Sequence, residues 1–204
     1  HEAEELDLDE AQTRRIIDEQ LHEAGWEADT PALTYTTGAR PVRGRNLAIA
    51  EWPTSNGPAD YVLFVDLIPV AVVEAKRQRR DVAGAIEQAR RYSRGYPVGG
   101  DQRSPDGPWG AYNVPFLFAT NGRPFLRQIA EKSGIWFCDA RQDTNHPRAL
   151  EAWYTPEGLS QLLQQDIAAA TTRLAAEAQN KQSLSGGAPG VEADASPWKS
   201  DDEA

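Results

Sequence analysis

Apolar residues recur at helical spacing in two stretches of the chain. In residues 8–26 they return every three to five positions, which predicts an amphipathic helix with Asp9 as its N-cap and Gly25 at its end. Residues 81–96 show the same periodicity behind Asp81, a second N-cap candidate. These two stretches supply the first two helices of the expected fold.

A third helix is expected near the C-terminal end of the apolar pattern. Residues 150–179 read as helical from about Pro156, and the hydroxyl of Thr155 is a suitable N-cap. From about Asn180 the chain turns rich in Ser, Gly, Pro and acids, a composition typical of a flexible tail.

Between the helices, short apolar runs bounded by turn residues indicate β-strands. A hairpin is expected around a turn at Asp66–Pro69, and Asn121-Gly122 marks another turn. The stretch 33–52 suggests a short strand, a basic loop containing Gly and Pro, and the start of a second strand. The remaining strand candidates are residues 61–65, 70–76, 114–120 and 134–140.

The alternation of helices and strands predicts an α/β fold, with one mixed central β-sheet flanked by helices. A chain of 204 residues suits one domain with a sizeable core. We place that domain at residues 1–176 and treat residues 177–204 as an acidic, flexible tail or linker.

Composition narrows the class of protein. A hydrophobic content of 40% and a charged content of 25% are typical of a globular protein, and no apolar run approaches the ~20 residues that span a bilayer. Cys138 is the only cysteine, which rules out an intrachain disulfide and favours a reducing, cytoplasmic setting. The chain lacks methionine and begins with His1, so we expect a fragment of a longer protein.

Charge is distributed unevenly along the chain. The net charge is −10, yet residues 1–29 alone carry 11 acids and 2 bases, whereas residues 40–95 carry 10 bases and 6 acids. The local field decides whether a polyanion can dock, so the acidic total does not exclude a nucleic-acid partner. A solvated basic face would produce the same excess.

Ionisable residues stand at the open end of the predicted hairpin. Glu74 and Lys76 are two residues apart on one strand and therefore project to the same face, and the turn brings Asp60 to the same end. Two carboxylates suit Mg²⁺, a hard cation, and the carbonyl of Ala75 offers another oxygen. Lys76 would position a water or stabilise charge on a phosphate, which is the chemistry of phosphodiester hydrolysis. Alternatively, Glu74 and Lys76 form a solvated ion pair and Asp60 serves the turn.

These residues resemble the PD-(D/E)xK nuclease superfamily, with Pro58-Ala59-Asp60 as its first half and Glu74-Ala75-Lys76 as its second. One residue separates the proline from the aspartate here. Downstream, Gln88 and Tyr92 are similar to the superfamily's Q-xxx-Y pair on the helix after the catalytic strand. The resemblance implies a restriction-endonuclease-like core, with Gln88 ordering the site and Tyr92 contacting the substrate backbone or locking the helix.

Three further stretches are similar to the N-terminal nuclease domain of the type I restriction enzyme endonuclease (R) subunit. They are residues 10–26 around the first helix, residues 57–63, and residues 116–123, which contain Thr-Asn-Gly-Arg. The resemblance covers about residues 8–176. Members of that family continue into ATPase motor domains, but this chain has no G-xxxx-GK[ST] loop and therefore no such ATP site.

The resemblance also suggests further site residues. It places Glu10 on the first helix as a metal ligand, although Glu10 is also simply one of the 11 acids of the N-terminal region. For contacts to DNA we choose Arg77, Arg91 and Arg123. Asn121-Gly122 then serves the turn beside Arg123.

Taken together, the resemblance implies a Mg²⁺-dependent DNA endonuclease domain, with Mn²⁺ able to substitute and ATP used only by the full-length parent subunit. The implied partners are DNA and the methyltransferase and specificity subunits of a restriction-modification complex, with no membrane. A stand-alone repair or recombination nuclease of the same superfamily, or a catalytically silent module that binds DNA or partners, are the alternatives.

Overall fold

The computed structural model describes residues 2–78, 80, 82–97, 99–100 and 102–165. The residues up to Gln164 form one compact unit. The predicted boundary at residue 176 and the predicted tail lie outside the described residues, and so does the second half of the third predicted helix. No helix in the described ranges is long and apolar enough to cross a membrane.

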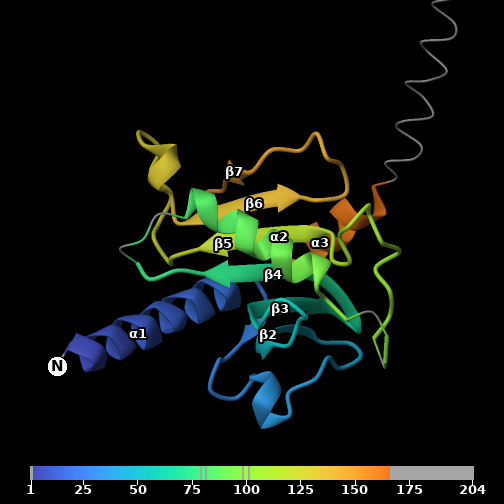
Figure 1. Ribbon diagram of the computed structural model, residues 1–204, viewed down its shortest axis with the longest axis horizontal. Helices are drawn as coiled ribbons and strands as arrows, with labels where there is room; N and C mark the ends of the chain where they lie inside the picture. Colours follow the sequence, from blue (N-terminus) through green and yellow to red (C-terminus); the bar gives the residue numbers. More distant parts are fainter. Residues whose placement is uncertain (1, 79, 81, 98, 101, 166–204) are drawn as a thin grey trace, which may run out of the picture. The chain divides into compact units, whose positions relative to one another are not determined.

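The fold is α/β, built around one mixed sheet of seven strands (Figure 1). The elements, in chain order, are α1 (Glu2–Glu23), β1 (Glu27–Ala28), η1 (Tyr35–Thr37), β2 (Asn46–Trp52), β3 (Ala59–Val65), β4 (Ile68–Ala75), η2 (Ala83–Ala85), α2 (Ile86–Arg94), β5 (Phe116–Thr120), η3 (Ala130–Lys132), β6 (Ile135–Asp139), β7 (Arg148–Ala149) and α3 (Pro156–Gln164).

The strands stand in the sheet in their order along the chain. β1 runs parallel to β2 and β4 runs parallel to β5, while the other neighbours are antiparallel. The parallel β4–β5 pair requires a crossover, which α2 supplies by packing on both strands. The ends of β4 and β5 therefore lie side by side at the same edge, which places the segment after β4 next to the turn after β5.

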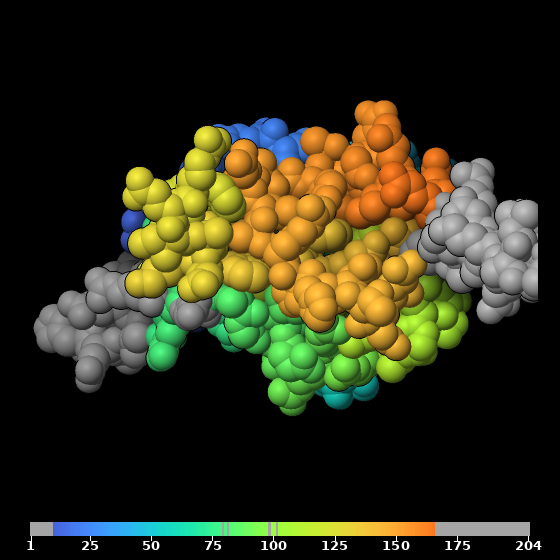
Figure 2. Space-filling model, turned by 90° about the horizontal axis from the view of Figure 1, so that it is seen from above, coloured from blue at the N-terminus to red at the C-terminus, as the bar shows by residue number. Residues whose placement is uncertain are grey.

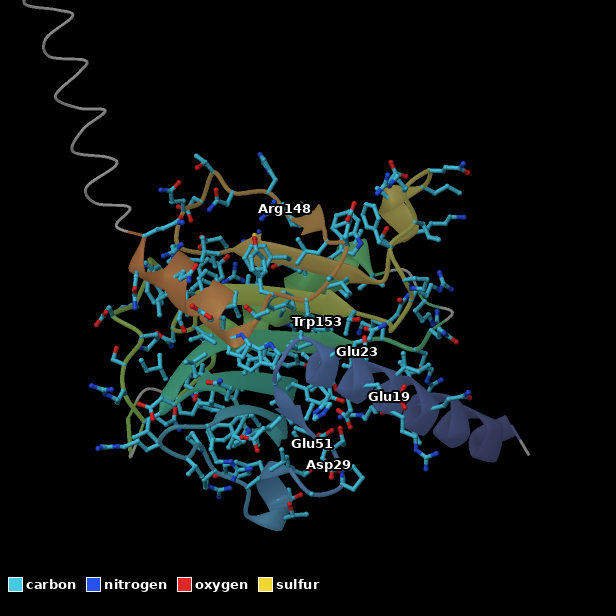
Figure 3. The ribbon with its side chains drawn as sticks, turned by 180° about the vertical axis from the view of Figure 1, so that it is seen from behind. Glu19, Glu23, Asp29, Glu51, Arg148 and Trp153 are labelled. Atoms are coloured by element: carbon cyan, nitrogen blue, oxygen red, sulfur yellow. The ribbon has the colours of Figure 1, made fainter. Side chains whose placement is uncertain are left out.

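Side chains alternate between two apolar clusters, one on each face of the sheet. Leu47 and Ile49 of β2 pack in the cluster beneath α2, whereas Ala48 and Ala50 pack on the opposite face with Ile17 of α1. Figure 1 shows α2 in front of the sheet, and the reverse view in Figure 3 shows α1 and α3 on the other side. Burial on both faces explains why the strands are apolar almost throughout.

Several predicted boundaries were wrong in detail. The first helix begins at Glu2, so Asp9 lies inside it and is not its N-cap. Its end follows the prediction, since Gly25 adopts φ 93° and the N–H of Trp26 closes on the carbonyl of Leu21. The predicted strand near residue 33 is only an isolated bridge at Thr34, followed by a 3-10 turn.

The other helices agree with the sequence in position but differ in their ends. The second begins with the 3-10 turn η2 before α2, and Asp81, its predicted cap, lies outside the described residues. Thr155 caps α3 as predicted, because its Oγ1 accepts a hydrogen bond from the N–H of Gly158 at 3.0 Å. The two-residue strands β1 and β7 carry no sequence pattern long enough to predict them.

Candidate active site

The β3–β4 hairpin brings the two predicted carboxylates together at its open end. Tyr61 pairs with Val73 in the sheet register, and one step further along the strands places Asp60 beside Glu74. The backbone N–H of Ala75 donates to Oδ2 of Asp60 at 2.7 Å, which fixes that carboxylate against β4. The geometry therefore follows from the register of this antiparallel pair, which shifts between Leu63 and Phe64. The predicted turn at Asp66–Pro69 was too long, because β3 ends at Val65 and β4 begins at Ile68.

Burial makes it unfavourable for both acids to be ionised at the same time. The side chain of Glu74 is 5% exposed and that of Asp60 is 20% exposed. Burial, followed by the negative charge of Glu74, raises the pKa of Asp60 to about 7, against the opposing effects of the Ala75 N–H and of Arg14. Two acids held this close favour any cation that can neutralise them.

Lys76 supplies one such cation just beyond the end of β4. Its Nζ donates to Oε1 of Glu74, as the i, i+2 spacing predicted. Its backbone N–H donates to the carbonyl of Thr120 at 2.7 Å, so that the residue is tied to the end of β5. The second carboxylate oxygen of Glu74, Oε2, is buried and has no hydrogen-bond partner among the described residues. An orphaned buried oxygen of this kind is expensive unless something binds it.

A cavity of about 220 Å³ opens next to this group. Asp60 and Lys76 form part of its wall, whereas Glu74 does not line it. The lining residues are Glu10, Thr13, Arg14, Asp60, Ala75, Lys76, Arg77 and Arg80.

The donor set fits a hard divalent cation. It offers two neighbouring carboxylates, with one orphaned oxygen on Glu74, and the pKa of Asp60 is raised by burial and by the charge of Glu74. The described residues contain no group of three or more His, Cys, Asp or Glu side chains placed to hold a metal. Water or substrate oxygens would therefore complete the coordination, which is usual for Mg²⁺.

Arg14 is a member of the site to which sequence reasoning gave no role. One of its guanidinium nitrogens, Nη2, lies 3.0 Å from Oδ1 of Asp60 and 2.6 Å from Oε1 of Glu51. It reaches Asp60 from α1, across 46 residues of sequence, and no local pattern announces such a contact. Glu51, which stands in the left-handed region at φ 54° on β2, was missed for the same reason.

Glu10 lines the cavity, and its carboxylate is paired with two arginines. Its carboxylate is 3.9 Å from Nη2 of Arg14 and 3.7 Å from Nη2 of Arg77, and its side chain is 52% exposed. The structure thus brings Glu10 to the predicted site without joining it to Asp60 and Glu74 as a third ligand. A role for Glu10 in metal binding stays a prediction.

Tyr92 projects from α2 toward Glu74, and Gln88 on the same helix hydrogen-bonds Tyr92. Tyr92 is buried, and its pKa is raised by that burial first and by the charge of Glu74 as well, while a hydrogen bond from Gln88 acts in the opposite direction. Gln88 and Arg91 line a second cavity of about 450 Å³ that shares Lys76 with the first. Lys76 therefore stands between the two cavities.

The three arginines chosen for DNA contacts occupy different places. Arg77 lines the first cavity and Arg91 the second, where its Nη1 donates to Oε1 of Gln88 at 3.2 Å. Arg123 lines neither cavity, and its backbone N–H donates to Oδ1 of Asn121. Arg80, which was not predicted, lines the first cavity together with Arg77.

Comparisons with known proteins place the chain in context. The family described as the second domain of the type I restriction enzyme EcoKI endonuclease subunit matches residues 27–163. The type I restriction enzyme EcoKI endonuclease subunit of Escherichia coli (strain K12) is 40% identical over 186 residues, covering 78% of this chain. The match spans only 16% of that relative's length. No solved structure matches the chain significantly.

Proposed function

The chain belongs to the family of type I restriction enzyme endonuclease subunits, and from that premise we propose that it is a Mg²⁺-dependent DNA endonuclease domain. The observation that carries the proposal is the convergence of Asp60, Glu74 and Lys76 beside one cavity, with an orphaned carboxylate oxygen among them. The substrate would be the phosphodiester backbone of DNA.

Asp60 and Glu74 would hold the Mg²⁺ ion, and Mn²⁺ would substitute for it. When bound, such a cation lowers the pKa of a coordinated water and offsets the charge that develops on a phosphate. The Ala75 N–H fixes Asp60, and Lys76 orients the attacking water or faces the phosphate. Tyr92 packs α2 against Glu74, and Gln88 orders the polar groups between α2 and Lys76.

DNA would lie across the two cavities, where basic side chains gather. Arg77, Arg80 and Arg91, which line the cavities, would contact phosphates, and Arg123 would add a contact beyond β5. Contacts of this type give affinity without base recognition, and that affinity weakens with salt. Sequence recognition and modification would belong to specificity and methyltransferase subunits, and ATP-driven translocation to a longer parent chain. A cytoplasmic location is part of this proposal.

A catalytically silent module is the second candidate, and one contact favours it. Arg14 already supplies a positive charge to Asp60, so the site has a counter-ion of its own. Titration calorimetry with Mn²⁺ separates the two. A nuclease site binds Mn²⁺ in the wild-type protein and loses that binding in Asp60→Ala, whereas a silent module has no Mn²⁺ site that depends on Asp60.

The direct test is cleavage of plasmid DNA by the intact protein with its partner subunits, with and without Mg²⁺. We expect Asp60→Ala, Glu74→Ala and Lys76→Ala each to lower the rate by about 10³-fold or more. Glu157→Ala is the control, because Glu157 carries an exposed carboxylate on α3 and lines neither cavity. Wild-type cleavage by any of the first three variants would remove that residue from the mechanism.

A further inference from the structure

Asn121 makes more contacts than a turn requires. Its side chain is fully buried. The amide nitrogen donates to the carbonyl of Arg80 at 2.7 Å and to that of Gln78 at 3.4 Å, while the amide oxygen accepts from the N–H of Arg123 at 3.1 Å. Only the last of these bonds belongs to the turn after β5. The other two reach the segment that follows β4.

That segment carries cationic side chains of the candidate active site. Lys76, Arg77 and Arg80 all line the first cavity, and the N–H of Arg80 closes a tight turn onto the carbonyl of Arg77 at 2.8 Å. At its start, the segment is held by the bond from the Lys76 N–H to the Thr120 carbonyl. At its far end, the contacts in the described residues that tie it to β5 are those of Asn121. The parallel pairing of β4 with β5 places the two ends within reach of each other.

We propose that Asn121 is a positioning residue that latches the segment after β4, and so aims Arg77 and Arg80 at the phosphates of bound DNA. The inference rests on the proposed nuclease function and deepens it. A buried amide with both of its hydrogen-bonding ends engaged is rigid and specific, because breaking either contact leaves a desolvated polar group. The loop after β5, yellow in Figure 2, lies on the surface of the molecule and carries Arg123 and Arg127.

One substitution separates the latch from the turn. Asn121→Asp keeps the side-chain oxygen that accepts from Arg123, but places a second oxygen opposite the carbonyls of Gln78 and Arg80. A residue that served only the turn would tolerate this change, since Asp is as common in turns as Asn. Asn121→Ala removes both functions and adds no charge, so it controls for the negative charge that Asp introduces.

Asn113 provides a matched control elsewhere in the protein. Its side-chain nitrogen donates to the carbonyls of Arg94 and Tyr96 at 3.3 and 3.1 Å, which is the same pair of bonds made to a different loop. Asn113 lines neither cavity of the site. Asn113→Asp therefore measures what the loss of such a bridge costs the fold alone.

The experiment compares the four proteins, wild type included, in three measurements on the intact protein. In plasmid cleavage, we expect both Asn121 variants to lower kcat/KM by about 10- to 100-fold, and Asn113→Asp to leave it unchanged. In titration with Mn²⁺ alone, we expect wild-type affinity in every variant, because Asp60 and Glu74 are held by β3 and β4. In limited digestion with trypsin, we expect faster cutting after Arg77 and Arg80 in the Asn121 variants only.

Each outcome decides the inference. Wild-type kcat/KM in Asn121→Asp, with or without loss in Asn121→Ala, overturns the latch and leaves Asn121 a turn residue. Equal losses in Asn113→Asp overturn it as well, since the effect would then be one of general stability. If neither the wild-type protein nor any variant cleaves DNA, the proposed function has failed. The rate of digestion by trypsin then tests the latch separately. Faster cutting after Arg77 and Arg80 supports the latch, and unchanged cutting overturns it.

Discussion

Two aspartates stand at opposite ends of the β3–β4 hairpin. Both side chains are partly exposed, but their neighbouring groups differ. Asp66 occupies the turn, with φ 58° and a side chain 29% exposed, and Asp60 occupies the open end, with a side chain 20% exposed. Asp66 accepts a hydrogen bond from the N–H of Gly44 at 2.8 Å and lies 3.5 Å from Nη1 of Arg103. Asp60 faces a second carboxylate, Glu74, and its pKa is raised by burial and then by the charge of Glu74.

The comparison shows that burial alone does not mark a functional acid. The contacts of Asp66 are with hydrogen-bond donors, so its charge is satisfied and its place in the turn explains it. Asp60 is also contacted by donors, Arg14 and the Ala75 N–H, yet its pKa remains raised because burial, and after it the charge of Glu74, outweigh them. The fold holds two like charges close together although their repulsion is unfavourable. This feature distinguishes a candidate site residue from an acid with a structural role.

Stabilisation by a divalent metal should show the largest difference between Asp60 and Asp66. We expect Mn²⁺ at about a hundred times its dissociation constant to stabilise the wild-type fold by about 3 kcal/mol, because the ion binds only the folded pair Asp60 and Glu74. Thermal unfolding would then shift upward by roughly 5–10 °C and return with EDTA. Asp66→Asn should retain this shift and Asp60→Asn should lose it. Retention of the shift in Asp60→Asn would show that the metal binds elsewhere.

The pH dependence of stability should separate them next, in metal-free buffer. The folded pKa of Asp60, about 7, lies above its unfolded value of about 3.9, so the unfolded chain releases this proton first and stability falls as pH rises between these values. The Asp60→Asn variant has no such proton to release, so this decline in stability is absent from it. Its stability relative to wild type should therefore increase by about 1–3 kcal/mol from pH 4 to pH 7, as measured by denaturant unfolding.

Glu74→Gln is the control for that measurement. Without the charge of Glu74, the pKa of Asp60 falls, so the decline in stability with rising pH should be smaller than in the wild-type protein. A wild-type profile parallel to that of Asp60→Asn across pH 4–7 would contradict the raised pKa.

The same hairpin shows how far sequence reasoning extends. The hairpin pattern placed Asp60, Glu74 and Lys76 at one end of the sheet, whereas the short turn before Ile68 and the register shift between Leu63 and Phe64 were not predicted. The sequence did not predict the contacts of Arg14 or the latch function of Asn121. Each of these contacts joins segments about 40 residues or more apart. Local patterns determine which face a side chain takes, whereas the packing of α1 and the parallel β4–β5 pair determines what that side chain meets.

The weakest expected effect concerns Asp66 itself. Asn tolerates the left-handed backbone at this position and keeps an oxygen for the Gly44 N–H, while the lost ion pair with the exposed Arg103 is worth little. Asp66→Asn should therefore change the free energy of unfolding by less than about 0.5 kcal/mol, and Asp66→Ala, which loses the acceptor, should cost about 1 kcal/mol. Denaturant unfolding measures both. If Asp66→Asn altered the pH dependence of stability as strongly as Asp60→Asn, the raised pKa of Asp60 would no longer single out one end of the hairpin as the site.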